Sequence, residues 1–340
     1  MTETLVSMAM MKVLAKKTLT RIGILRVLAR RRPNAVAILM YHSVMENPKL
    51  VVDSLGEIVH PTRVFDAQMQ MLARDFHPIS LDDLYKFVRS EAELPKRSVV
   101  VTFDDGYADN YEVAMPILTR VGVPASFYVT VDCVERKTLP WPSRLRFAFR
   151  TTPKRTWIDE KAISWALGFP QQRERAYLSA CDQFCKLSGA SLESRVSQTE
   201  IDLDAKISDA TGNLMMDWDQ ARSLAKNGYI VGSHTMTHPN LAFLELEDVR
   251  RELNDSKRQM QDRMGMPIHH VSYPCPALFP NWTQQTTAES QRAGYKTAVT
   301  TTNGLAHERD NPLQLKRLGP TKTVDGLRWN LESAFAGWSG

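Results

Sequence analysis

Two adjacent aspartates and two histidines four residues apart have the residue types that a hydrolytic metal site needs. Asp104 and Asp105 follow a β-branched run over residues 98–103, and His234 and His238 stand further along the chain. Catalytic zinc commonly takes three protein ligands from histidine and carboxylate and leaves one position for water. Asp105, His234 and His238 match that count. Asp104 is then free to act as general base, because the metal neutralises only one of the two carboxylates.

Each motif alone has a plainer explanation. Asp-Asp-Gly is a common turn, and His-x-x-x-His occurs by chance on many helices. The position of the motifs makes the combination specific, because both directly follow apolar runs, as His42 does after the run over residues 36–41. In α/β folds, groups at the carboxyl ends of parallel strands meet at one rim, where catalytic residues gather.

The hydrophobic pattern predicts an α/β fold in which strands and helices alternate. This rhythm favours parallel strand pairing with right-handed crossovers. The expected strands are residues 36–41, 98–103, 125–131, 229–232, 270–273 and 296–301, and the main expected helices are residues 65–76, 111–121, 218–227, 245–264 and 284–293.

The 340 residues, 43% of them hydrophobic, suffice for one large α/β domain. We expect it to cover residues 35–330, preceded by a basic amphipathic helix over residues 1–34. Residues 140–213 differ in character, since they are charged, helix-forming and poor in β-branched runs. This stretch is predicted to be a mostly helical insertion in the catalytic domain.

The positive charge of the chain is concentrated at its N-terminal end. Residues 1–32 contain eight basic residues and one acidic residue, a net charge of +7, whereas the whole chain carries +5, so the remainder is at −2. This distribution argues against nucleic acid as a partner. A basic amphipathic helix favours peripheral contact with an anionic membrane, and the alternative is a solvated helix packed on the domain. Its longest uncharged run is too short to span a bilayer. A secretory signal is not expected either, because the positive charges follow that run and no small-residue cleavage site does, so a cytoplasmic protein is expected.

Two longer segments resemble the first two motifs of the polysaccharide deacetylases, carbohydrate esterase family 4, also called the NodB-type homology domain. They are Val101-Thr-Phe-Asp-Asp-Gly-Tyr-Ala-Asp-Asn110 and Gly232-Ser-His-Thr-Met-Thr-His-Pro-Asn-Leu241. The likeness covers about residues 35 to 320, outside most of the insertion. Further matches are Ile38–His42, Phe65–Gln68, Pro124–Phe127, Trp218-Asp219, Ser272–Pro274 and Lys316–Leu318. The resemblance implies a distorted (β/α) barrel.

The resemblance also implies metal-dependent removal of an N-acetyl group from an amino sugar. The metal would be Zn²⁺, or another divalent ion such as Co²⁺, Ni²⁺ or Mn²⁺. Carried over by position, Asp104 is the general base, and Asp105, His234 and His238 are the metal ligands. The backbone N–H of Cys275, in the third motif, would help to hold the oxyanion.

Two departures from the common family pattern shift the other roles. The third motif has Ser272 where many members have arginine, and residues 313–318 lack the histidine that many members use as general acid. The pattern is closest to the poly-N-acetylglucosamine deacetylase branch, whose acid histidine lies in an N-terminal strand. His42 is therefore the expected general acid, with a structural core histidine as the alternative. Arg317 is the candidate to orient or ion-pair with Asp104 in place of the missing arginine.

Substrate contacts are expected from Tyr273 and Pro274 in the third motif and from Trp141. An aromatic face suits the apolar face of a sugar ring, but packing is the favoured role of Trp141. The expected activity is N-deacetylation of an N-acetylated sugar in a glycan, glycolipid or oligosaccharide, at the inner face of a bacterial membrane. The alternatives are hydrolysis of a non-sugar amide at the same site and a catalytically inactive glycan-binding protein.

Overall fold

A computed structural model describes residues 24–30, 34–205, 214–319 and 321–338. In this part of the chain no helix combines the length and the apolar character needed to cross a membrane. The strands are β1 (Ala35–Tyr41), β2 (Ser43–Met45), β3 (Val59–Pro61), β4 (His77–Pro78), β5 (Ser98–Phe103), β6 (Ala125–Val129), β7 (Thr156–Ile158), β8 (Ser164–Ala166), β9 (Ile230–Ser233), β10 (His270–Ser272), β11 (Thr297–Asn303), β12 (Ala306–His307) and β13 (Leu315–Arg317). The helices are α2 (Ile24–Arg30), α3 (Thr62–Asp75), α4 (Leu81–Val88), α5 (Met115–Val121), α6 (Val131–Arg136), α7 (Trp141–Thr151), α8 (Pro170–Phe184), α9 (Gly189–Asp202), α10 (Trp218–Lys226), α11 (Leu246–Met264), α12 (Gln284–Arg292) and α13 (Val324–Phe335), with short 3-10 or π segments η1 (Pro48–Val51), η2 (Gly56–Ile58) and η3 (Asn110–Ala114).

Parallel strands form a barrel, as the family resemblance implies. The main sheet runs in the order β12-β1-β5-β6-β9-β10-β11-β13, and the pairs from β1 to β13 are parallel. Beyond β13, Leu318 donates its N–H to the carbonyl of Ile38 at 2.7 Å and accepts from the N–H of Met40 at 3.1 Å. These two hydrogen bonds join the last strand to the first and close the barrel.

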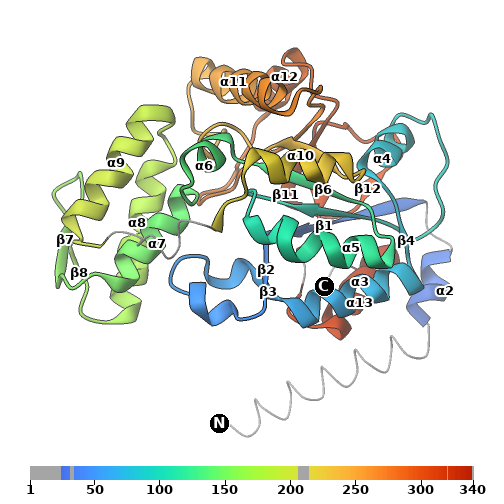
Figure 1. Cartoon of the computed structure of the whole chain (residues 1–340), viewed down its shortest axis with the longest axis horizontal. Coiled ribbons are helices and arrows are strands. Elements are labelled where there is room, and N and C mark those ends of the chain that lie inside the picture. The colour runs from blue at the N-terminus through green and yellow to red at the C-terminus, as the bar shows by residue number, and fades with distance from the viewer. Residues whose placement is uncertain (1–23, 31–33, 206–213, 320, 339–340) are drawn as a thin grey trace, which may run out of the picture.

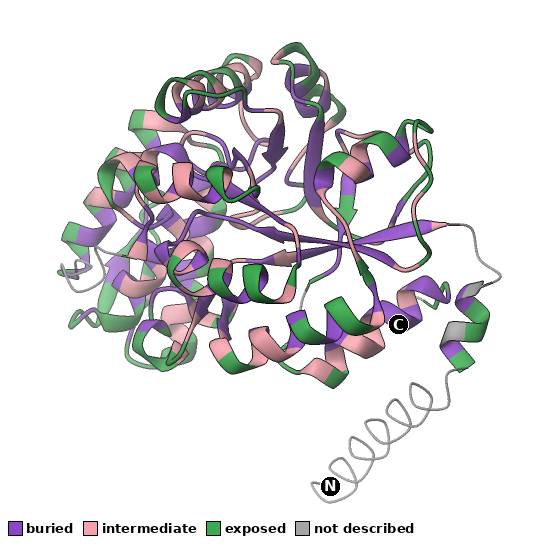
Figure 2. Cartoon of the chain, turned by 45° about the vertical axis from the view of Figure 1, so that its right-hand side comes forward, coloured by how far each residue is buried: buried purple, intermediate pink, exposed green. Residues whose placement is uncertain are grey.

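The barrel has separate inner and outer apolar layers. Alternate residues of a strand face opposite sides, so Ile38, Val100 and Leu315 pack inside the barrel with the side chains of α4, which covers one end. The neighbouring positions, such as Leu39 and Val101, pack outward under α3, α5, α10, α11 and α13. Figure 1 shows these helices on both sides of the sheet, and Figure 2 shows that the strands are buried while the helices expose one face.

Local signals at the helix ends agree with the observed boundaries. Ser80 and Asp83 form a reciprocal capping box at the start of α4, and Asp217 and Gln220 do the same for α10. Gly122 ends α5 with a left-handed φ of 69°, a conformation that glycine adopts without steric cost. These signals fix where the crossover helices begin and end, and hence the lengths of the connections that return the chain to the sheet.

Helices α7, α8 and α9 and the β7–β8 hairpin form a unit with its own apolar cluster. Its core contains Leu145, Phe149, Tyr177, Phe184 and Val196, all buried. The unit lies beyond one end of the sheet, at the left of Figure 1. The sequence predicts a mostly helical insertion over residues 140–213, and the structure adds the antiparallel β7–β8 pair to it. Residues 206–213 are outside the described part of the chain.

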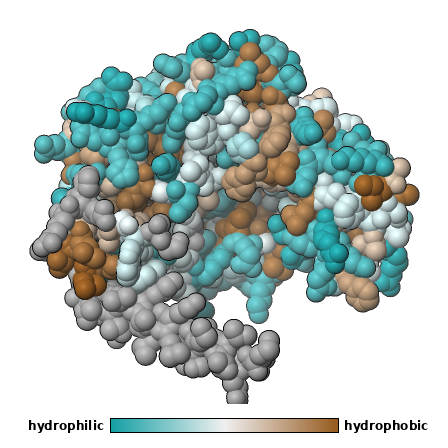
Figure 3. All heavy atoms as spheres, turned by 180° about the vertical axis from the view of Figure 1, so that it is seen from behind, coloured by the Kyte–Doolittle hydropathy of each residue, from teal (hydrophilic) through white to brown (hydrophobic). Residues whose placement is uncertain are grey.

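Helix α2, at the beginning of the described chain, lies against α13 near its end. Leu25 and Ala29 are buried, and α2 packs against α13. Ile24, Val27 and Leu28 remain exposed and contribute an apolar patch at the lower left of Figure 3. Most of the basic helix expected over residues 1–34 falls on residues 1–23, which lie outside the described residues.

The close packing inside the barrel predicts that Gly232 has no room for a side chain. A Cβ on Gly232 would lie 2.7 Å from the carbonyl oxygen of His270 and 2.8 Å from the ring of Tyr128. We expect Gly232→Ala to lower the free energy of unfolding by about 1–3 kcal/mol, because the backbone and ring must shift. Gly319→Ala is the matched control, since no atom lies within 4 Å of its Cβ position. Equal urea midpoints for the two variants would contradict this description of the barrel interior.

Candidate active site

The inward-facing register of three strands places three predicted site residues at the same end of the barrel. Residues two apart on a strand share a face. His42 follows β1, Asp104 follows β5, and His234 follows β9, each continuing the inward-facing positions of its strand. The N–H of Asp104 donates to the carbonyl of Tyr41 at 3.0 Å, which holds the ends of β1 and β5 together.

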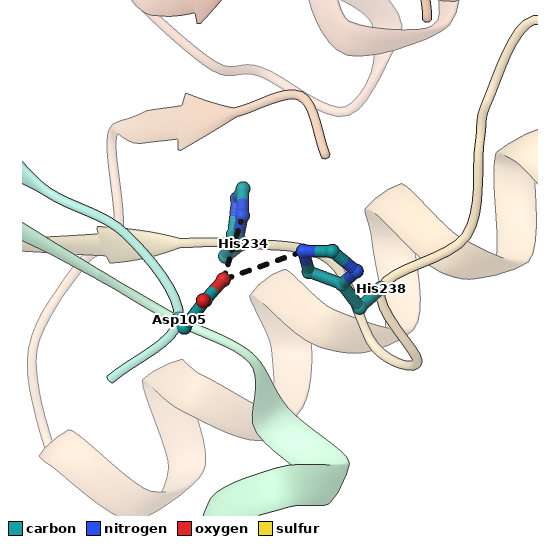
Figure 4. A group of neighbouring side chains, drawn as sticks. All are labelled: Asp105, His234 and His238. Carbon is teal, nitrogen blue, oxygen red and sulfur yellow. Dashed lines mark ion pairs between the residues drawn. The ribbon is translucent and has the colours of Figure 1, made fainter. Parts of the chain in front are cut away.

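Asp105, His234 and His238 converge on one point (Figure 4). Oδ1 of Asp105 lies 3.4 Å from Nε2 of His234 and 3.3 Å from Nε2 of His238. One ligand atom from each residue lies within 4.8 Å of the others, and all three residues are buried. The structure therefore brings together the two motifs, which are separated by well over a hundred residues of sequence.

A tight turn after β5 aims the two carboxylates in different directions. Asp105 has a left-handed φ of 74° and Gly106 one of 88°, and the Gly106 N–H donates to the carbonyl of Asp104 at 3.0 Å. A left-handed backbone is uncommon for residues other than glycine, asparagine and aspartate and costs free energy that the surrounding structure must supply. The turn separates the carboxylate of Asp105, beside the imidazoles, from that of Asp104, beside Arg317.

The three side chains fit a divalent metal ion. Nδ1 of His234 lies 2.9 Å from the carbonyl oxygen of Ser272, which makes Nδ1 the protonated nitrogen and leaves a lone pair on Nε2. That lone pair faces Oδ1 of Asp105, a buried oxygen that lacks a hydrogen-bond partner among the described residues. Two lone pairs this close require a cation between them, either a proton on Nε2 or a divalent metal ion. Two imidazole nitrogens and one carboxylate oxygen are a ligand set that zinc accepts.

The electrostatics around Asp105 also favour a cation at this site. Burial alone would raise the pKa of Asp105, but the adjacent imidazoles of His234 and His238 lower it well below its usual range. Burial lowers the pKa of His234, but Asp104 and Asp105 more than offset this and raise it. The pocket thus favours a negative carboxylate and added positive charge at the position where the ligand atoms meet.

Asp104 forms a buried bidentate ion pair with Arg317. The guanidinium Nη1 lies 2.9 Å from Oδ1 of Asp104, and Nη2 lies 2.7 Å from Oδ2. Arg317 is 1% exposed, and its other donors reach the hydroxyls of Thr102 and Ser272 and the carbonyl of Thr300. Burial raises the pKa of Asp104, but Arg317, together with His234 and His42, outweighs this effect and holds the pKa below its usual range.

The charges of Asp104 and Asp105 both act on the imidazole of His42. Burial lowers its pKa, while the charges of Asp105 and Asp104 oppose that effect. The carbonyl of His42 accepts a hydrogen bond from Nδ2 of Asn110 at 2.6 Å, which fixes the backbone immediately after β1. A histidine held beside the carboxylate pair is within the electrostatic reach of the site.

The third motif contributes backbone rather than an exposed aromatic ring. Tyr273 is 0% exposed, and its hydroxyl lies within hydrogen-bond distance of the Ser290 hydroxyl and the Leu313 carbonyl in the outer core. Nδ2 of Asn281 donates to the carbonyls of Tyr273 and Pro274, both at 3.2 Å. The side chain of Tyr273 therefore cannot meet a substrate as expected. Cys275 follows Pro274 and is partly exposed.

Trp141 also lacks the exposed face that sugar stacking requires. Its side chain is 4% exposed and packs near Phe184 within the α7–α9 unit. The indole Nε1 donates to the carbonyl of His238 at 2.9 Å. This burial agrees with the packing role that the sequence favours for Trp141 and leaves no free ring face for the alternative of sugar stacking, while the indole N–H is engaged by a candidate metal ligand.

Glu252 and Ser272 take part in the site although sequence reasoning gave them no role there. Glu252 lies on α11 and accepts hydrogen bonds from the loop between the two histidines. A signal existed in the sequence, because Glu252 occupies the same helical stripe as the buried residues Val249, Leu253 and Ser256. A carboxylate in a core stripe needs a polar partner.

Comparisons with known proteins agree on one family. The family model described as polysaccharide deacetylase matches residues 91–298. The protein YxkH of Bacillus subtilis, assigned to the polysaccharide deacetylases, is 20% identical over 296 residues, which are 87% of this chain and 75% of YxkH.

Solved structures share the fold at low sequence identity. The deacetylase PplD of Streptococcus pyogenes, determined in complex with acetate, has a TM-score of 0.58 and 19% identity, and the match covers 88% of this chain and 99% of PplD. IcaB from Ammonifex degensii has a TM-score of 0.55 and 16% identity, covering 89% of this chain and 99% of IcaB. These similarities establish the barrel architecture.

The buried ion pair predicts a large stability cost for removing one partner. Arg317→Met deletes the charge but keeps a long side chain, and it leaves Asp104 buried without a cation. We expect the free energy of unfolding in urea to fall by about 3–5 kcal/mol.

The double variant Asp104→Asn/Arg317→Met is the control for this prediction. Removing both charges avoids a lone buried carboxylate, so the double variant should regain part of the stability lost in Arg317→Met. A double variant no more stable than the single one would show that the charge pair is not what Arg317 supplies.

Proposed function

Because this chain belongs to the polysaccharide deacetylase family, we propose that it is a metal-dependent N-deacetylase that hydrolyses the acetamido group of an N-acetylated sugar and releases acetate. The observation that supports this most is the buried set of Asp105, His234 and His238 beside a second carboxylate that is held separately. A binding protein needs no such carboxylate next to a metal site, whereas a hydrolase does.

The proposed ligands are Asp105, His234 and His238, and the proposed metal is Zn²⁺, with Co²⁺, Ni²⁺ and Mn²⁺ as alternatives for the same donor set. A divalent ion bound there supplies water of lowered pKa and polarises the amide carbonyl. Asp104 is the proposed general base that accepts the proton of the attacking water. Arg317 keeps Asp104 ionised and oriented through its two hydrogen bonds.

The reaction also needs a proton for the departing amine and a donor for the oxyanion, and we assign these roles to His42 and Cys275. His42 follows β1 on the inward-facing side and is the proposed general acid that protonates the departing amine. The backbone N–H of Cys275 is the proposed donor to the oxyanion that develops on the amide carbonyl. Pro274 is itself buried and directly precedes this N–H, so the substrate contact at the third motif is proposed for the backbone at Pro274 and not for the ring of Tyr273.

Asp104→Asn tests the division of roles between the two aspartates. Asparagine keeps the size of the side chain but cannot accept the proton, so we expect turnover to fall by a factor of about 100 or more. Metal content, measured after dialysis, should remain that of the wild type. His238→Ala is the contrasting variant, since it should lose both metal and turnover. Retained activity in Asp104→Asn would overturn the base assignment.

The substrate class is tested by acetate release from a panel of N-acetylated sugars. The zinc-loaded protein is incubated with free, polymeric and lipid-linked N-acetylated sugars and with non-sugar acetamides. Release from sugars is expected, with chelation by EDTA abolishing it and zinc restoring it. Release only from non-sugar amides would favour the alternative hydrolase, and binding without release would favour a glycan-binding protein.

We also propose peripheral contact with an anionic membrane. The basic residues of segment 1–32 and the exposed Ile24, Val27 and Leu28 of α2 support it. Replacing these three apolar residues by serine leaves Leu25 and Ala29 packed, so the fold should persist while sedimentation with anionic vesicles decreases severalfold. Unchanged sedimentation relative to the wild type would refute this contact.

A further inference from the structure

The loop of residues 234–238, which carries both histidines, is anchored on one side by α11. Oε2 of the buried Glu252 accepts from the N–H groups of Met236 and Thr237, both at 2.9 Å, and Oε1 accepts from the Thr237 hydroxyl at 2.5 Å. A carboxylate that accepts three hydrogen bonds fixes the middle of the loop.

The start of α6 anchors the first half of the same loop. The N–H groups of Val131 and Asp132 donate to the carbonyls of Thr235 and Met236, at 3.2 and 3.0 Å. Helix N-terminal N–H groups lack partners within the helix, so this contact satisfies them. Neither α6 nor Glu252 reaches the carbonyl of His238, the second histidine.

The two histidines differ in how their rings are oriented. Nδ1 of His234 is paired with the carbonyl of Ser272, whereas the buried Nδ1 of His238 lacks a hydrogen-bond partner among the described residues. A ring without its own partner is oriented by the backbone that carries it. That backbone is left-handed, with a φ of 61° at His238, a conformation that must be stabilised by neighbours.

The α7–α9 unit supplies the contacts at this position. Trp141, at the start of α7, donates its indole N–H to the carbonyl of His238 at 2.9 Å. Gly189, at the start of α9, donates its N–H to the hydroxyl of Thr237 at 3.2 Å. Trp141 is enclosed by the apolar cluster of this unit, so its indole is held rigidly where it meets the loop.

We propose that Trp141 is a positioning residue of the metal centre, and that through it the α7–α9 unit sets the affinity of the site for its metal. The hydrogen bond from the indole fixes the peptide group on the C-terminal side of His238 and thereby helps to direct a ring whose Nδ1 has no partner among the described residues. This inference rests on the proposed function, because it takes Asp105, His234 and His238 as ligands.

The test compares Trp141→Phe with Trp157→Phe. Both tryptophans are buried in the same cluster, but the indole nitrogen of Trp157 has no partner in the described structure. Metal-free proteins are titrated with Co²⁺ against a competing chelator, and the visible absorption of the bound ion is recorded. We expect Trp141→Phe to weaken Co²⁺ binding about tenfold or more and to shift the absorption bands. Trp157→Phe should stay within about twofold of the wild type.

Circular dichroism at the titration temperature separates folding from positioning. Should Trp141→Phe be unfolded, Thr237→Val replaces it. This change removes both the acceptor for Gly189 and the hydrogen bond to Glu252, so Glu252→Gln, which leaves the Gly189 contact in place, is measured beside it, and weaker Co²⁺ binding is expected for Thr237→Val than for Glu252→Gln. Equal Co²⁺ affinity and spectra for the folded variant and Trp157→Phe would overturn the positioning role. If the His238→Ala variant bound Co²⁺ as tightly as the wild type does, the proposed function and this inference would both be overturned.

Discussion

The burial of two consecutive carboxylates is the constraint on which the rest of the site depends. Two negative charges on adjacent residues in a low-dielectric barrel repel one another, and each requires its own positive partner. Asp104 receives a guanidinium through two hydrogen bonds, and Asp105 faces two imidazoles whose geometry suits a shared cation. The left-handed turn at Asp105 and Gly106 separates the two environments. Chemically identical side chains thereby acquire different environments, which suit the different roles proposed for them.

Closure of the barrel is what delivers the guanidinium. Arg317 lies 213 residues from Asp104 in sequence, and it reaches the carboxylate because the strand that carries it returns to β1 through Leu318. The hydroxyls and carbonyl that accept its remaining N–H groups come from three other strands, β5, β10 and β11. A guanidinium with every donor engaged has one orientation. The closure of the sheet therefore fixes Arg317, and Arg317 in turn aligns the proposed base, Asp104.

The sequence predicts the repeating elements well, because long apolar strands and amphipathic helices have strong periodicity. It misses α13, and it misses β13 as a strand because three residues carry no period. The expected pairing of Arg317 with Asp104 came from family resemblance, since spacing alone says nothing of barrel closure. Tyr273 and Trp141 show what the sequence does not reveal, which is whether an aromatic side chain is buried. Both sit next to site residues in sequence or space, but burial depends on tertiary packing, which decides whether an aromatic ring meets solvent or core.

The position of β13 near the end of the chain has a consequence for biosynthesis. As the protein emerges from the ribosome, both aspartates and both histidines are translated well before Arg317, so the Asp104 carboxylate has no guanidinium until nearly the last strand is available. Contacts between such distant segments are also slow to form. A nascent chain that has not yet reached β13 therefore lacks the complete charge arrangement around Asp104.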